Sequence, residues 1–143
     1  NMTNFYYTFF LCFLLTTISN AQDTKILVGK WALTKYTVTF EKKQETRKID
    51  EPGIYEFKPD STYILTCNDL WGKAKIIGKW KSIGSNKFYL YETKHISEVK
   101  GELPVSNGTE IKIKTINKHS VLYVASSDTP LGDLHELYYE KTK

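Results

Sequence analysis

The sequence Gly29-Lys30-Trp31 opens the first segment with strand character, which continues to Phe40, and the pattern returns as Gly78-Lys79-Trp80. A glycine allows a neighbouring backbone to come close, and a tryptophan two residues later lies on the same face of a strand. Such a pair suits the closed end of a small β-barrel, where one large ring must fill the lumen. We therefore expect Gly29 and Trp31 to form a structural plug.

The segment around the second copy has the clearest pattern in the chain, because polar and apolar residues alternate from Lys73 to Ile83. This period of two is typical of a strand with one dry and one wet face. The dry face holds Ala74, Ile76, Gly78 and Trp80, and the other face holds Lys73, Lys75, Ile77, Lys79 and Lys81.

Other short runs rich in β-branched and aromatic residues follow one another with turn residues between them. Ser106-Asn107-Gly108 is the best tight-turn signal and predicts a type I′ hairpin. The charged segment Glu41–Pro52, which contains the only arginine, Arg47, predicts a mobile loop. The expected strands are 31–40, 53–58, 62–67, 73–83, 87–92, 95–101, 110–114, 120–126 and 134–141. Their meander order predicts an all-β fold, an antiparallel up-and-down barrel of eight or nine strands.

The N-terminal stretch is apolar from Phe9 to Ile18 and is followed by small residues up to Ala21. This pattern predicts a secretory signal peptide over residues 1–21 and one barrel domain over residues 22–143. The alternative is an N-terminal anchor helix. With a signal peptide, the domain is exported to the periplasm or the extracellular space.

The composition gives no sign of a catalytic or metal site. The net charge of +4 is too small to predict nucleic-acid binding, and Cys67 is the only cysteine after the signal, so no internal disulfide is expected. We expect Cys67 to be a buried structural thiol. His95, His119 and His135 lack metal-ligand spacing, and no nucleophile elbow or phosphate loop occurs. We expect no enzyme activity, no metal and no cofactor.

Four motifs resemble the lipocalin-like domains of exported bacterial proteins of the Bacteroidetes type. They are Leu27-Val28-Gly29-Lys30-Trp31, the segment Tyr55 to Tyr63 (YEFKPDSTY), Gly78-Lys79-Trp80, and Leu137-Tyr138-Tyr139-Glu140-Lys141. The resemblance implies a lipocalin-like barrel. In classical lipocalins an arginine near the end of the barrel packs over the first tryptophan, but here the last strand offers only Lys141 and Lys143. A lysine cannot stack as a flat guanidinium does. We therefore expect Trp31 to lack that lid.

Two functions follow from the dry and the wet faces. In the first, the barrel holds a small hydrophobic ligand, with candidate contacts at Tyr36, Tyr55, Phe57, Leu65, Ile76, Trp80, Phe88, Leu90 and Ile113. In the second, the barrel is filled and the protein acts through its loops and through a basic strand face. That face, formed by Lys73, Lys75, Lys79 and Lys81, would meet an anionic envelope component.

Overall fold

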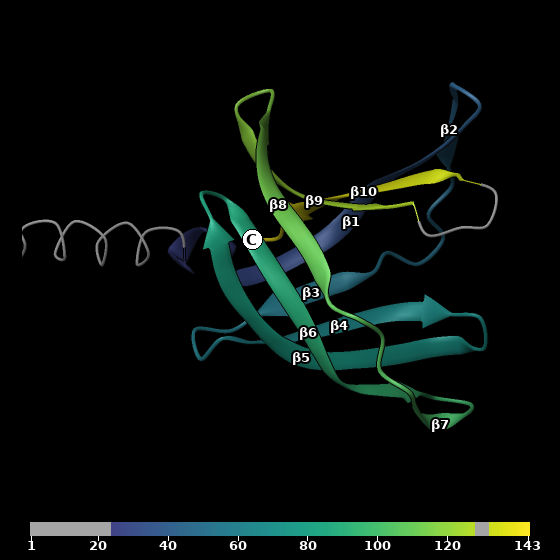
Figure 1. The fold of residues 1–143 in the computed structure, drawn as a ribbon, viewed down its shortest axis with the longest axis vertical. Coiled ribbons are helices and arrows are strands. Elements are labelled where there is room, and N and C mark those ends of the chain that lie inside the picture. Colours follow the sequence, from purple (N-terminus) through teal and green to yellow (C-terminus); the bar gives the residue numbers. More distant parts are fainter. Residues whose placement is uncertain (1–23, 128–131) are drawn as a thin grey trace, which may run out of the picture.

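The computed structural model describes residues 24–127 and 132–143 (Figure 1). The signal peptide expected over residues 1–21 lies outside the described residues. Thr24–Leu27 form a helical turn, and within the described ranges no helix is long and apolar enough to cross a membrane.

The rest of the described chain is β-structure in ten strands. They are β1 (Gly29–Phe40), β2 (Lys43–Arg47), β3 (Ile54–Phe57), β4 (Thr62–Asp69), β5 (Gly72–Gly84), β6 (Lys87–Ser97), β7 (Gly101–Leu103), β8 (Thr109–Ile116), β9 (His119–Ser126) and β10 (Leu134–Lys141). Eight of them form an antiparallel barrel in the order β1-β3-β4-β5-β6-β8-β9-β10, which closes because β10 pairs with β1. The outer strands β2 and β7 pair with β1 and β6. The prediction of a closed antiparallel barrel is confirmed.

The meander order places the connections of the barrel alternately at two ends (Figure 1). The helical turn covers one end, where Leu27 is fully buried and its carbonyl oxygen accepts a hydrogen bond of 2.8 Å from the indole Nε1 of Trp31. We call this the closed end. The opposite end carries the β1–β2 and β4–β5 turns, β7 and the start of β10, and we call it the open end.

Gly78 shows why the second glycine pattern matters for the barrel. A Cβ atom at this position would lie 2.0 Å from the carbonyl oxygen of Tyr91 and 2.5 Å from the ring of Tyr63. The pairing of β5 with β6 shifts at this point, since Ile77 pairs with Lys94 and Gly78 with Glu92. The close approach expected of this glycine therefore lies at a β-bulge.

The segment Glu41–Pro52, predicted as a mobile loop, contains a strand at residues 43–47, so the prediction is wrong there, whereas residues 48–52 have no regular structure. Glu41 and Lys42 have φ values of 45° and 66°, which is the conformation of a type I′ turn, and β2 then pairs with the end of β1. All five residues of β2 are exposed. The residues of β2 are exposed and mostly charged, which is typical of a loop, but the tight turn at Glu41 and Lys42 pairs this strand with β1.

The predicted Asn107-Gly108 hairpin is also wrong, because neither residue adopts a positive φ. Residues 104–108 form an irregular connection. The expected separate strands 87–92 and 95–101 are replaced by continuous β6, and β7 returns along its end. The positive φ values occur instead at Asn117 and Lys118, between β8 and β9.

Candidate functional site

The inward-facing side chains of the barrel fall into two levels. At the closed end the interior is filled by fully buried residues, among them Trp31, Phe57 and Phe88. Toward the open end, Leu65 and Ile76 pair with each other on the same face, and each packs against the buried core while remaining half-buried. The side chains of Leu65 and Ile76 are therefore partly accessible to solvent, whereas the interior at the closed end is sealed.

The nine candidate ligand contacts divide between these levels. Tyr55, Phe57, Trp80, Phe88, Leu90 and Ile113 belong to the buried core cluster, and Leu65 and Ile76 pack against it. Tyr36 is half-buried and lies nearer the open end of β1. Trp80 is only 3% exposed, and its Nε1 has no hydrogen-bond partner in the described part of the chain. The contribution of these nine residues to ligand binding stays a prediction.

Tyr36 and His135 form a polar pair on the inner face of β1 and β10. The hydroxyl of Tyr36 lies 2.6 Å from Nδ1 of His135, and the two rings stack with centroids 5.8 Å apart. The second imidazole nitrogen, Nε2, is buried and makes no hydrogen bond with any described residue. The pair thus has a free hydrogen-bonding position.

Asp69 and His95 form a second pair, on β4 and β6, with Oδ2 and Nε2 3.6 Å apart. Their side chains are 15% and 20% exposed, and neither facing atom makes a hydrogen bond within residues 24–127 and 132–143. The other carboxylate oxygen of Asp69 accepts the backbone N–H of Trp71 at 2.8 Å. Two buried polar atoms therefore face each other without a good hydrogen bond, which is costly unless a third group joins them.

Glu92 is the third polar group of the open half. It follows the buried Leu90 in the alternation of β6, and its carboxylate accepts hydrogen bonds from the backbone N–H and the hydroxyl of Ser106, at 2.8 and 2.7 Å. Burial raises the pKa of Tyr63, and the charge of Glu92 raises it further. Glu92 thus raises the pKa of Tyr63 and also binds the 104–108 connection through Ser106.

Cys67 is a free thiol of β4 that is half-buried, less enclosed than the structural thiol we expected. Burial raises the pKa of this thiol, and the carboxylates of Asp69 and Glu92 add to the effect. Two carboxylates in the open half of the barrel therefore raise the pKa of the same thiol.

Asp69, Glu92, His95 and His135 were not among the candidate binding residues expected from the sequence. A signal existed for two of them, because Phe88-Leu90-Glu92 and His135-Leu137-Tyr139 each keep the period of a strand face. The bulge in β6 hides His95, since it shifts the alternation by one residue. No group of three or more His, Cys, Asp or Glu side chains among the described residues is placed to hold a metal ion.

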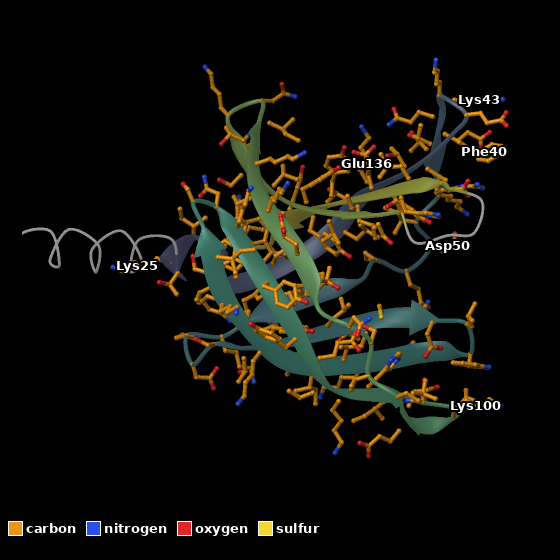
Figure 2. The ribbon with its side chains drawn as sticks, in the orientation of Figure 1. Lys25, Phe40, Lys43, Asp50, Lys100 and Glu136 are labelled. Atoms are coloured by element: carbon orange, nitrogen blue, oxygen red, sulfur yellow. The ribbon has the colours of Figure 1, made fainter. Side chains whose placement is uncertain are left out.

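A hollow of about 360 Å³ lies beside the lumen, between the β1–β2 ribbon and the start of β10. Val38 and Phe40 provide its apolar surface, and Arg47 pairs in register with Tyr36 on the same ribbon. Figure 2 shows Phe40 and Lys43 together at the tip of this ribbon. The inner surface of the barrel therefore continues beyond its rim. The complete lining is Val38, Phe40, Lys43, Glu45, Arg47 and Asp133.

The predicted basic face lies on the outside of β5. Lys73, Lys75, Lys79 and Lys81 are all exposed, and no carboxylate of the described residues lies within ion-pair distance of them. The ammonium of Lys81 stands 5.2 Å from the ring centre of Tyr91 on β6. These charges are consequently available to a partner.

Comparisons with models of protein families, with curated proteins and with solved structures find no match. The geometry of the barrel combines partly accessible apolar side chains toward the open end with a few buried polar atoms that lack hydrogen-bond partners among the described residues.

Proposed function

We propose that the protein is an exported lipocalin-like binding protein that holds a small, mostly apolar molecule in the open half of its barrel. The observation that supports this best is the half-buried state of inward-facing apolar side chains, such as Leu65 and Ile76, above a fully buried floor. A ligand that covers exposed apolar surface inside the lumen stabilises the complex by about 25 cal/mol for each Å² removed from water.

The buried polar pairs would orient the ligand. Tyr36 and His135 lie on β1 and β10, and Asp69 and His95 lie on β4 and β6, so the strand order places the pairs on different sides of the lumen. A ligand with a hydroxyl, amide or similar group would supply the missing hydrogen bond to Nε2 of either histidine.

The lipocalin-like character of the proposal is supported by the places of the resembling motifs. Tyr55 and Tyr63 lie on the β3–β4 hairpin, where Asp60 accepts hydrogen bonds from the backbone and the hydroxyl of Thr62. Gly29 and Trp31 lie at the closed end. These are the positions that the resemblance implies for a barrel of this kind.

The test is the binding of N-phenyl-1-naphthylamine, a neutral apolar dye whose fluorescence rises when it leaves water. Leu65→Trp would fill the open half, whereas Ile64→Trp adds the same ring one residue earlier, on the outer face of β4, where Ile64 pairs with Ile77. We expect the dye to bind the parent protein and the Ile64 variant, and to bind the Leu65 variant at least about tenfold more weakly.

Equal dye affinity for the two variants, with both folded by circular dichroism, would place the dye outside the lumen and contradict the proposal. The same conclusion would follow if the parent protein did not bind the dye. A dye-positive protein can then be screened with apolar molecules that carry one polar group, to find a natural competitor.

A further inference from the structure

The turn between β4 and β5 exposes two large apolar side chains. Leu70 is 92% exposed and Trp71 46% exposed, at the open end of the barrel. Trp31 and Trp80, in contrast, are at most 3% exposed. A tryptophan beside a nearly fully exposed leucine on a turn is costly in water, and such apolar surface usually marks an interaction site.

This turn has a definite conformation and an apolar neighbour. The carboxylate of Asp69 accepts the N–H of Trp71, and the N–H of Glu98 donates to the carbonyl of Lys73 at 2.9 Å. The second bond places the 98–100 turn, with Val99 67% exposed, next to the start of β5. Leu70 and Trp71 on one turn and Val99 on the neighbouring turn are exposed at the same end of the barrel, and we call these three residues the tip.

Basic side chains flank this tip. Lys73 and Lys75 follow it on the outer face of β5, and Lys94 lies on the neighbouring strand, whose outer face continues theirs. Lys100 stands at the β6–β7 turn, at the same end of the barrel (Figure 2). All four are exposed, and none has an ion-pair partner within the described ranges. The acidic side chains beside these lysines are Glu51, Glu98 and Glu102, so the four lysines outnumber the carboxylates by one and the surface is weakly basic.

We propose that the tip and its lysines dock the protein on an anionic lipid surface. Leu70 and Trp71 would enter the interface between headgroups and acyl chains, where tryptophan is favoured, and the lysines would meet the negative headgroups. Charge complementarity favours lipid over a protein partner, because lysine is depleted at the core of protein interfaces but strengthens binding to anionic membranes.

Two further observations fit a flat partner. Phe40, the last residue of β1, and Val105, in the 104–108 connection, are 45% and 49% exposed and also lie toward the open end. Exposed apolar groups on separate turns match a fluid layer better than one shaped pocket. Docking would bring the mouth of the barrel near the bilayer, but it does not depend on the proposed ligand.

The test uses vesicles of phosphatidylcholine with and without phosphatidylglycerol. Because Trp71 is the exposed tryptophan of the three in the chain, its emission reports insertion. We expect a blue shift and co-sedimentation with the anionic vesicles only, both reduced by added salt. Trp71→Phe should keep the binding and remove most of the blue shift.

The variants separate the apolar from the electrostatic contribution. Leu70→Ser with Trp71→Ser should weaken binding at least about tenfold, whereas Ile83→Ser, which removes an apolar side chain 44% exposed at the closed end, should not. Lys73→Gln and Lys75→Gln should each cost about fivefold, and Lys87→Gln at the closed end should cost little.

Three results would overturn the proposal: no binding to anionic vesicles, equal binding to neutral ones, or binding that the tip variants leave unchanged. The dye assay separates this test from that of the proposed function. A Leu65→Trp protein that loses the dye but still binds vesicles supports both proposals. A protein that binds the dye but no vesicles supports only the ligand site.

Discussion

Lys141 places its ammonium group 5.3 Å from the ring centre of Trp31 and donates a hydrogen bond of 3.0 Å to the carbonyl oxygen of Ile26. We expected Trp31 to lack the lid that an arginine forms in classical lipocalins. The last strand nevertheless supplies a cation at this place. The lysine ammonium is attracted to the face of the indole ring as a point charge, without the planar stacking that a guanidinium can make.

Replacing Lys141 tests the strength of this lid. We expect Lys141→Ala to lower the free energy of unfolding by about 1 kcal/mol, because it removes a partly exposed cation–π contact and a hydrogen bond to a carbonyl. Lys141→Arg should preserve stability, and Lys143→Ala should have little effect. Urea denaturation followed by tryptophan fluorescence measures all three. A Lys141→Ala protein as stable as the parent would show that the contact contributes nothing.

Gly78 provides a steric prediction. A methyl group there would meet the carbonyl of Tyr91, which the backbone cannot easily move, so Gly78→Ala should cost about 3 kcal/mol. Gly84→Ala is the matched control on the same strand, since its nearest contact would be 3.8 Å from the flexible side chain of Lys87. Thermal unfolding should separate the two variants clearly. Similar stabilities would mean that the bulge absorbs the methyl group.

Glu92 should hold the 104–108 connection to the barrel wall. Glu92→Ala removes two hydrogen bonds of a carboxylate to Ser106, and we expect a loss of about 1.5–3 kcal/mol in the local free energy of opening. Hydrogen exchange at the amide of Ser106 should accelerate, while exchange within β9 stays slow. The control is Glu102→Ala on β7. Unchanged exchange at Ser106 would contradict this role.

Cys67 should react slowly and report ligand binding. A raised pKa means less thiolate at a given pH, so alkylation by iodoacetamide near neutral pH should be slower than for free cysteine and should rise as the pH approaches the raised value. A ligand in the lumen should slow it further. Mass spectrometry localises the adduct. Alkylation as fast as for free cysteine, or without protection by the bound dye, would contradict this placement.

The barrel was predictable because alternation is a local property. Residues 73–83 separate a lysine face from an apolar face, and the structure places Trp80 inside and Lys79 outside. Local turn signals were less reliable. Asn107-Gly108 favours a tight turn, but the pairing of Ser106 with Glu92 and of β7 with β6 determines the path there. Glu41-Lys42 has weak turn propensity and still forms the tight turn.

The apolar interior could be read from the same alternation, whereas the polar pairs could not. Tyr36 and His135 are 99 positions apart and meet only because β1 and β10 close the barrel. Asp69 and His95 meet across β5, after a bulge that changes which residues face inward. Such pairs depend on strand order and register, which a single sequence does not specify.

The seam between β1 and β10 joins the first strand of the domain to the last. During synthesis the ribosome releases β10 only after every other strand, so the cylinder cannot be completed on a growing chain. Until then Trp31 lacks the cover of Lys141, and both edges of the sheet remain unpaired. We therefore expect the barrel to fold slowly and to complete its packing only after synthesis of β10.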